Sequence, residues 1–245
     1  MYPSSMARLT GESRARYVHA LFARIAQRYD LMNRLMTAGQ DVRWRREVIR
    51  RAALRPGDRL LDLGAGTGDL AQEALRQCPA CRPLAADFTL EMMRVGQRRP
   101  GNRVAHWLAA DALRLPFSDN TFDAVVSGFL LRNVIDLPLA LREQFRVLKP
   151  GGRWLALDTT RPRRRPLSPF IRFHLHHVIP TLGRLITGER VAYTYLPDST
   201  EQFLSAEGLA MQAQHAGLYQ VGFTRRMFGT IAIHWGRKAV ESAPV

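Results

Sequence analysis

The chain has 245 residues, of which 46% are hydrophobic, and its formal net charge at pH 7 is +15. A chain of this size suits one large domain, or one domain with an added cover, and it can bury a full core. No run of about 18 apolar residues occurs, which excludes a membrane-spanning helix, and no secretory signal peptide is visible. We therefore expect a cytoplasmic protein whose two cysteines, Cys78 and Cys81, are thiols.

The positive charge is concentrated in two segments of the chain. Residues 1–57 hold twelve arginines against four acidic residues, and residues 161–190 hold seven arginines against one. The rest of the chain is close to neutral. This distribution indicates an anionic surface as a partner, either nucleic acid or lipid headgroups.

Apolar spacing and turn signals divide the chain into helices and strands. Helical spacing predicts helices over 13–30, 41–53, 69–77, 89–99, 138–148 and 199–215. Short apolar runs predict strands over 59–63, 82–86, 103–109, 122–129 and 153–158, and alternation over 218–238 predicts two more. Asp41 and Thr89 are candidate helix caps. Strands that alternate with helices imply crossovers and a parallel sheet.

The elements around this alternating core are interpreted as covers on a single domain of residues 1–245. The expected parts are an N-terminal helical cover (1–57), a ligand-binding core (58–158), a helical insertion (159–198) and a C-terminal helix with strands (199–245). In the insertion, apolar side chains fall at helical spacing, and we expect them either to line a channel or to pack on the sheet: Ile171, Leu175, Val178, Leu182 and Leu185.

A glycine run follows the first predicted strand, in the stretch "LLDLGAGTGDL" (60–70). Glycines between a strand and a helix let backbone N–H groups approach a ligand at the helix N-terminus. The third glycine comes one residue too early for the G-x-G-x-x-G fingerprint of dinucleotide sites. Alternate glycines, with an acid two residues before the first, are instead the pattern of S-adenosylmethionine (SAM) sites. We expect the methionine end of SAM to be held by Asp62, Gly64, Gly66, Thr67 and Gly68.

Acidic residues also follow the second and third predicted strands. Asp87 ends the second strand, where a carboxylate can accept both hydroxyls of a ribose, and Asp111 with Ala112 follows the third, where an adenine edge would be read. Gly128 and Phe129, after the fourth strand, are expected to form the pocket wall. Ligands of parallel sheets bind at the carboxyl ends of the strands, so these side chains should meet there.

With these residues in place, the sequence resembles the ubiquinone/menaquinone biosynthesis C-methyltransferase family, a group of class I SAM-dependent methyltransferases. The most specific stretches are Y-D-x-M-N in the N-terminal cover and L-R-N-V after the fourth strand. The matching segments are 22–46, 60–70, 111–123, 131–152, 193–199 and 229–238. The resemblance implies a doubly wound, mostly parallel α/β sheet of seven strands with the last strand antiparallel; the residues alone indicate five parallel strands and a terminal hairpin.

The resemblance also implies the reaction, which is transfer of a methyl group from SAM to a ring carbon of a polyprenylated quinol at the membrane surface. Demethylmenaquinol is the favoured substrate and a methoxylated polyprenyl benzoquinol is the runner-up, since no residue separates one ring from two fused rings. The basic segments could then contact anionic lipid on the inner face of the membrane. No metal is expected, because methylation of an activated ring does not need one, and a homodimer is left open.

The ring carbon becomes reactive when the neighbouring hydroxyl loses its proton, so the site needs a proton acceptor and a group that stabilises the oxyanion. We expect Arg132 to orient a water that takes the proton and to stabilise the phenolate, and Asn133 to hydrogen-bond the ring oxygen. Tyr29 is a further catalytic candidate. Asn33, Tyr195 and Asp158 are candidates for substrate binding. The competing interpretation of Arg132 is a structural salt bridge, with Asp136 as the candidate partner.

Two other classes of function remain as alternatives. The charge of +15 favours an RNA methyltransferase, but the "RPRRR" segment (161–165) has no aromatic residue to stack on bases. We therefore expect no nucleic-acid partner. A SAM-binding protein without catalysis is the other alternative, and the polar L-R-N-V segment at the expected methyl side argues against it.

Overall fold

A computed structural model of the chain describes residues 11–161, 199–200 and 202–240. The helical insertion, including Tyr195 and the apolar positions from Ile171 to Leu185, lies outside the described residues apart from its first three positions. The elements in chain order are α1 (Gly11–Ile25), η2 (Ala26–Arg28), α2 (Tyr29–Met36), α3 (Gln40–Ala52), β1 (Arg59–Leu63), α4 (Asp69–Gln77), β2 (Arg82–Asp87), α5 (Leu90–Gln97), β3 (His106–Ala109), β4 (Phe122–Gly128), α6 (Leu137–Val147), β5 (Leu148–Thr159), α10 (Ala206–His215), β6 (Tyr219–Arg226), η4 (Met227–Gly229) and β7 (Ile231–Arg237).

The described strands form one seven-stranded sheet in the order β3-β2-β1-β4-β5-β7-β6. Strands β1 to β5 pair in parallel, and β7 runs antiparallel to both β5 and β6. The predicted fold is therefore confirmed, including the antiparallel last strand. From β1, the chain adds β2 and β3 on one side of the sheet and then β4 and β5 on the other. In a doubly wound sheet, a crevice that binds ligands forms at the carboxyl ends of the two strands where this change of side occurs, here β1 and β4.

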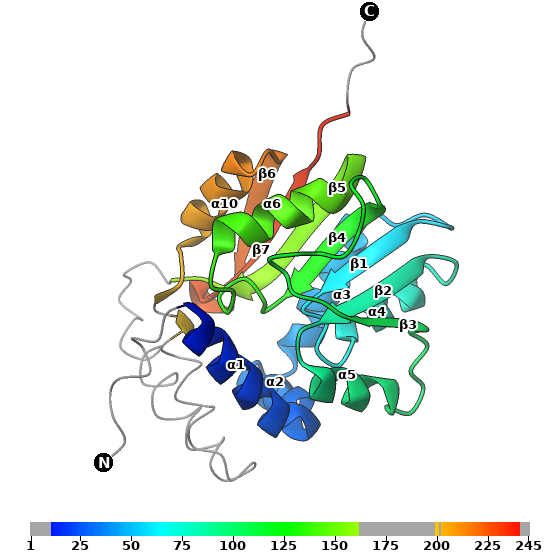
Figure 1. The fold of residues 1–245 in the computed structure, drawn as a ribbon, viewed down its shortest axis with the longest axis vertical. Helices are drawn as coiled ribbons and strands as arrows, with labels where there is room; N and C mark the ends of the chain where they lie inside the picture. The colour runs from blue at the N-terminus through cyan, green and yellow to red at the C-terminus, as the bar shows by residue number, and fades with distance from the viewer. Residues whose placement is uncertain (1–10, 162–198, 201, 241–245) are drawn as a thin grey trace, which may run out of the picture.

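Helices cover both faces of the sheet (Figure 1) because its strands are apolar on both sides. Successive strand residues alternate between two buried clusters. Leu60 and Val126 pack with α3 and α4 on one face, whereas Leu61 and Val125 pack with α6 and α10 on the other. Helix α1 lies against α5 at the carboxyl edge of the sheet, where the glycine run also ends (Figure 1).

Several predicted boundaries of helices and strands are wrong. The helix expected over 13–30 ends at Ile25, and a short 3₁₀ turn redirects the chain into α2. The helix expected over 199–215 is interrupted at 203–205, and α10 starts afresh with Ser205 accepting a hydrogen bond from Gly208 N at 3.1 Å. Strand β3 begins only at His106, and β5 extends back to Leu148.

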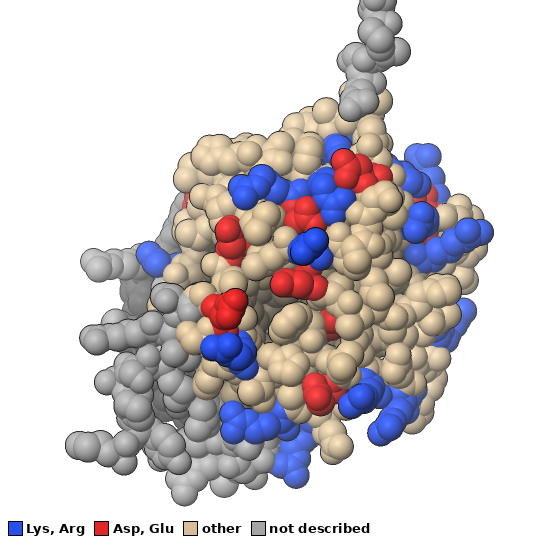
Figure 2. Space-filling model, in the orientation of Figure 1, with Lys and Arg blue, Asp and Glu red and all other residues tan. Residues whose placement is uncertain are grey.

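The surface carries opposite charges side by side. On the face shown in Figure 2, acidic and basic side chains are interspersed. Arg146 contacts Asp119 at 2.8 Å and Glu143 at 2.7 Å, and Lys149 contacts Asp123 at 2.8 Å. These acidic residues are therefore paired with basic neighbours, and the net charge of +15 is the excess of basic residues over all acidic ones.

Candidate active site

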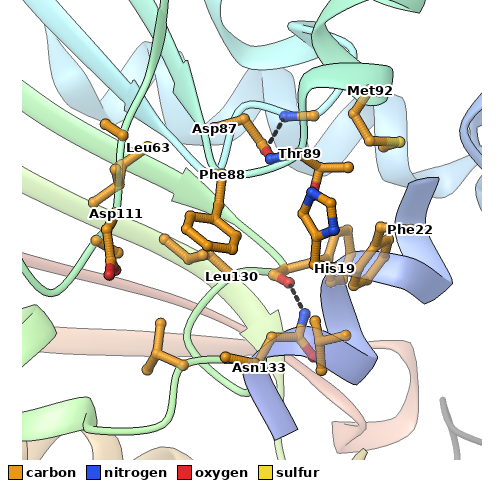
Figure 3. A pocket seen from close by; sticks show the side chains of 18 of the residues that line it. His19, Phe22, Leu63, Asp87, Phe88, Thr89, Met92, Asp111, Leu130 and Asn133 are labelled. Carbon is orange, nitrogen blue, oxygen red and sulfur yellow. Dashed lines mark hydrogen bonds between the residues drawn. The ribbon is translucent and has the colours of Figure 1, made fainter. Parts of the chain in front are cut away.

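A cavity with about 930 Å³ of empty space, partly open to solvent, lies at the carboxyl ends of the parallel strands. The loops after β1, β2 and β4 form its floor, and α1 forms the opposite wall (Figure 3). A smaller hollow of about 310 Å³ adjoins it beneath the glycine loop. Tyr29, Gly64, Gly66 and Gly128 line both spaces, so the two hollows meet at these residues.

The glycine loop takes a shape that other residues rarely adopt. Gly64 and Gly68 have φ angles of +66° and +83°. A Cβ atom on Gly64 would come within 2.8 Å of the Leu130 side chain, and one on Gly68 within 2.6 Å of Trp107. The alternate glycines thus give left-handed backbone and close packing together, and they leave open space beside β1.

Asp62 is a buried acid with one unsatisfied oxygen. Its Oδ2 accepts a hydrogen bond from Ala71 N at 2.9 Å, whereas no group in the described part of the chain donates to its Oδ1. Burial raises the pKa of Asp62 to about 7. The carboxylate lines the smaller hollow, so its free oxygen suits a cationic group placed there.

The loop after β2 is organised by Asp87. Its Oδ2 accepts from Gly66 N at 2.7 Å and its Oδ1 accepts from Thr89 N at 2.7 Å, while burial raises its pKa. Thr89 precedes α5 as predicted, but its side chain makes no capping hydrogen bond. Phe88 is 56% exposed and lines the cavity beside Asp87. A carboxylate has about four acceptor sites, so Asp87 can still bind a ligand hydroxyl.

The other predicted cofactor residues differ in which of the two hollows they line. Asp111, Ala112, Gly128 and Phe129 line the main cavity with Asp87. Thr67 lines only the smaller hollow, and Gly68 lines neither because it packs on Trp107.

Arg132 and Asp158 form a buried ion pair away from the cavity lining. Arg132 Nη1 lies 2.7 Å from Asp158 Oδ1, and the two side chains are 4% and 1% exposed. The predicted partner Asp136 is wrong, since its Oδ1 instead accepts from Leu139 N at 2.9 Å and caps α6. Asn133 does line the cavity, with its Nδ2 donating to Phe129 O at 3.0 Å.

Helix α2 brings Tyr29 to the junction of the two hollows. Burial raises the pKa of Tyr29, whereas the charge of Arg132 and the nearby Asn33 amide lower it. Asn33 is buried one turn further along α2 and lines neither hollow. The structure thus brings Tyr29 and Asn133 to the cavity and leaves Asn33 behind it.

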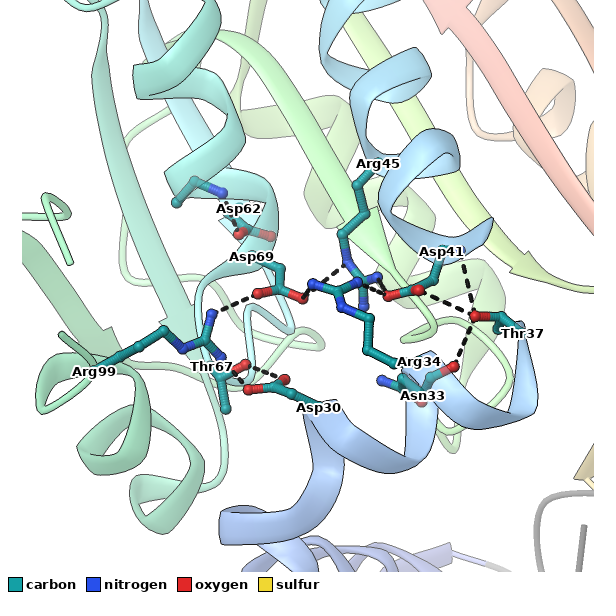
Figure 4. A network of polar contacts seen from close by, with 11 residues as sticks. Asp30, Asn33, Arg34, Thr37, Asp41, Arg45, Asp62, Thr67, Asp69 and Arg99 are labelled. Atoms are coloured by element: carbon teal, nitrogen blue, oxygen red, sulfur yellow. Dashed lines mark hydrogen bonds and ion pairs between the residues drawn. The ribbon is translucent and has the colours of Figure 1, made fainter. Parts of the chain in front are cut away.

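A polar network ties α2 and α3 to the glycine loop (Figure 4). Thr67 Oγ1 donates to Asp30 Oδ1 at 2.7 Å, and Arg99 bridges Asp30 and Asp69, with Nη1 2.6 Å from Asp69 Oδ1. Arg45 links Asp69, at 3.4 Å, to Asp41. The N-terminal helices are therefore joined to the start of α4 by charge-assisted hydrogen bonds.

The predicted helix cap at Asp41 is wrong. The N-cap residue of α3 is Gly39. Asp41 lies in the first turn of α3 and is buried within the polar network. Its carboxylate accepts from Arg34, Arg45 and the Thr37 hydroxyl. A buried carboxylate is stable only when paired, and two arginines meet that need here.

Sequence reasoning missed one wall of the site. Ala15, Val18, His19 and Phe22 on α1 all line the cavity. The signal was present in part, since Val18 and Phe22 belong to the apolar spacing that predicted the helix. Leu21 and Ile25, from the same spacing, are buried under the helix instead.

No group of three or more His, Cys, Asp or Glu side chains among the described residues is arranged to hold a metal ion. None of the helices in the described part of the chain is long and apolar enough to cross a membrane.

Known proteins resemble the chain at two levels. It is 46% identical over 221 residues to the ubiquinone/menaquinone biosynthesis C-methyltransferase UbiE of Desulfotalea psychrophila, covering 90% of each chain. It is 41% identical over 218 residues to the demethylmenaquinone methyltransferase of Thermus thermophilus, covering 88% of this chain and 99% of that one. In fold, it matches Haemonchus contortus phosphoethanolamine N-methyltransferase 2, solved with S-adenosylhomocysteine, with a TM-score of 0.61 at 15% identity over 80% of this chain and 52% of that one.

The family assignment agrees with the site described above. The family model of the ubiE/COQ5 methyltransferase family matches residues 10–238, which include the glycine loop, the cavity and the terminal strands. The chain therefore belongs to the ubiE/COQ5 methyltransferase family.

Proposed function

We propose that the protein transfers a methyl group from SAM to a ring carbon of demethylmenaquinol, which yields menaquinol. The observation that carries the proposal is a single cavity with two chemically different parts. One part is the polar floor made by the glycine loop, Asp87 and Asp111. The other is an apolar wall from Val18 and Phe22 of α1 and from Val134 and Ile135 after β4.

The cofactor is S-adenosyl-L-methionine. The unsatisfied Oδ1 of Asp62 fits the ammonium group of its methionine end, and Asp87 fits the ribose hydroxyls. Asp111 and Ala112 would contact the adenine, with Gly128 and Phe129 as the wall beside them. When bound, SAM supplies an electrophilic methyl group, so the protein must mainly position the ring carbon.

The apolar wall supports a lipophilic substrate over a polar one. Ile135 is 38% exposed at the cavity, and Leu130 and Val134 lie beside it in the lining. An isoprenoid tail gains about 0.8 kcal/mol for each CH₂ group that it buries. The relatives named as demethylmenaquinone methyltransferases support a naphthoquinol ring.

The experiment that tests this proposal supplies the purified protein with SAM and two reduced substrates. These are a demethylmenaquinol and a methoxylated polyprenyl benzoquinol, and mass spectrometry records which of them gains a methyl group. Methylation of the naphthoquinol supports the proposal, methylation of the benzoquinol alone assigns the runner-up, and methylation of neither overturns both. The oxidised quinones serve as controls, because their electrophilic rings should not react.

We also propose that the protein meets this substrate at the surface of the membrane. A polyprenyl tail cannot leave the bilayer cheaply, and each arginine near an anionic surface contributes about 1 kcal/mol. Arg43 and Arg50 on α3 are exposed in the basic N-terminal segment. Salt-sensitive co-sedimentation with anionic vesicles is expected, whereas tight RNA binding without vesicle binding would favour the RNA alternative.

A further inference from the structure

A histidine of the cavity lining lies close to a glutamate on the neighbouring helix. His19 on α1 lines the cavity, and its Nε2 lies 4.0 Å from Oε2 of Glu91 on α5. The imidazole packs edge-on against Phe88, with ring centroids 5.5 Å apart. Figure 3 shows the His19 side chain reaching from α1 toward the loop of Thr89.

One oxygen of this carboxylate lacks a hydrogen-bond donor in the described residues, although the side chains of His19 and Glu91 are 36% and 43% exposed. Glu91 Oε2 is buried, and no group in the described ranges donates a hydrogen bond to it. An unsatisfied buried oxygen is costly, and a protonated imidazole is the cation best placed to satisfy it. We infer that His19 is the proton acceptor for the quinol hydroxyl and that Glu91 stabilises the imidazolium that forms. This inference rests on the proposed quinol methylation.

The other titratable groups of the described lining are poorly suited to this role. Asp87 already accepts two backbone N–H groups, and Asp111 Oδ1 accepts from Leu113 N at 2.9 Å. Burial raises the pKa of Tyr29, so its phenol keeps its proton at neutral pH. Arg132 is paired with Asp158 outside the lining, and an arginine is a poor base in any case. Histidine, by contrast, changes charge near neutral pH.

The proton balance of the reaction accommodates this role. The hydroxyl oxygen keeps the O–H electron pair, and the proton passes to the imidazole nitrogen of His19 that faces the cavity. The ring carbon then takes the methyl group of the cofactor, whose C–S bonding pair remains on sulfur. Water takes the proton of that ring carbon, the ring becomes aromatic again, and His19 returns its proton to the oxygen. One proton is released in total, which is the stoichiometry of C-methylation.

Glu91 acts through His19 and is therefore a positioning residue. The charged groups nearest the imidazole are Glu91 from α5 and, on α1 itself, Arg16 one turn away and Glu12 two turns away, while Asp87 after β2 lines the same cavity. Arg16 and Glu12 pair with each other at 3.8 Å on the exposed side of the helix. The carboxylate of Glu91 lies close enough to stabilise an imidazolium once His19 has taken a proton.

The test replaces His19 with glutamine, which keeps the size and polarity of the side chain without its basicity. We expect kcat for the reduced naphthoquinol to fall about 100-fold or more, as for loss of a general base. The Kd of S-adenosylhomocysteine, measured by calorimetry, should stay within about twofold of wild type because His19 makes no cofactor contact in this proposal. The limb of the pH–rate profile that rises toward neutral pH should disappear in H19Q.

Two further variants make the result decisive. Glu91→Gln should lower kcat about tenfold and shift the pH–rate limb to lower pH, because it removes the charge that stabilises the imidazolium. His215→Gln changes an exposed histidine at the end of α10 and should behave as wild type. A kcat for H19Q within threefold of wild type, with the rising limb retained, would overturn the inference. Failure of the wild-type protein to methylate any quinol would instead overturn the proposed function itself.

Binding offers a readout that does not depend on turnover. In the complex with S-adenosylhomocysteine and reduced quinol, the NMR signal of the His19 imidazole, assigned by its absence in H19Q, should titrate at a different pH than in the free protein. A titration unchanged by the quinol would contradict contact between His19 and the substrate.

Discussion

The hydroxyl of Thr67, in the glycine loop, donates a 2.7 Å hydrogen bond to the carboxylate of Asp30, at the start of α2. Asp30 also contacts Arg99, which in turn contacts Asp69 at the start of α4. The N-terminal helices are thus bonded directly to the glycine loop that lines the two hollows.

Replacing Asp30 with alanine should weaken SAM binding. The change removes the acceptor of Thr67 and one partner of Arg99, and a hydrogen bond to a charged group contributes about 1.5–3 kcal/mol. We expect the Kd of SAM to rise about tenfold, as measured by calorimetry. Glu12→Ala removes an exposed carboxylate from the same N-terminal region and is the matched control. Equal affinity in both variants would show that the network does not support the loop.

Asp87→Ala should weaken SAM binding by at least tenfold, because charge-assisted hydrogen bonds to a ribose contribute about 1.5–3 kcal/mol each. The loop would also lose the acceptor for Gly66 N and Thr89 N. Asp87→Asn keeps one acceptor oxygen and should lose less affinity than Asp87→Ala. Unchanged calorimetric affinity in D87A would contradict the ribose assignment.

SAM binding should depend on pH through Asp62. Its pKa is about 7 in the free protein, so much of it is protonated below that pH. A cationic ammonium group beside Oδ1 favours the carboxylate, and binding should therefore release a proton and weaken as pH falls below 7. Calorimetry at pH 6 and pH 8, in two buffers of different ionisation enthalpy, measures both effects. Both effects should vanish in Asp62→Asn, whose affinity is lower at every pH.

The same residue predicts how the free protein responds to pH. Because folding raises the pKa of Asp62, its contribution to stability is fully present below the unfolded value near 4 and is lost as pH rises through about 7. Urea unfolding of wild type and D62N at pH 5 and pH 8 should show the wild type losing stability relative to the variant at the higher pH. A constant difference between the two proteins would contradict the raised pKa.

Arg132→Ala should destabilise the protein by about 3–5 kcal/mol, because it leaves the buried Asp158 carboxylate unpaired. Asp136→Ala removes only a helix cap and should cost about 1 kcal/mol. Replacing both members of the pair, with Arg132→Met and Asp158→Leu, should recover most of the stability. The turnover of this double variant distinguishes a catalytic role of Arg132 from a structural one. A large loss of turnover at unchanged SAM affinity would support the predicted stabilisation of the oxyanion. Near-normal turnover would show that the ion pair is only structural.

The sequence by itself determined the sheet and the edge of the sheet at which the cavity lies. Five apolar runs, each followed by a turn or a polar residue, are enough to place β1 to β5, because buried parallel strands are apolar on both faces. Glycines at alternate positions and acids at successive strand ends identified Asp62 and Asp87, since chain direction brings all carboxyl ends to one edge. These are short-range patterns, and the residues that make them are neighbours in sequence.

Only the tertiary structure decided which polar side chains face the ligand and which face one another. Arg132 and Asp158 are 26 residues apart and pair through the packing of the loop after β4 on β5. His19 and Glu91 meet because α1 crosses α5, and neither helix carries a pattern that names its partner. Side-chain pairing over such separations depends on where whole helices and strands pack. The free energy of that packing is the sum of many apolar contacts, so no single sequence motif predicts it.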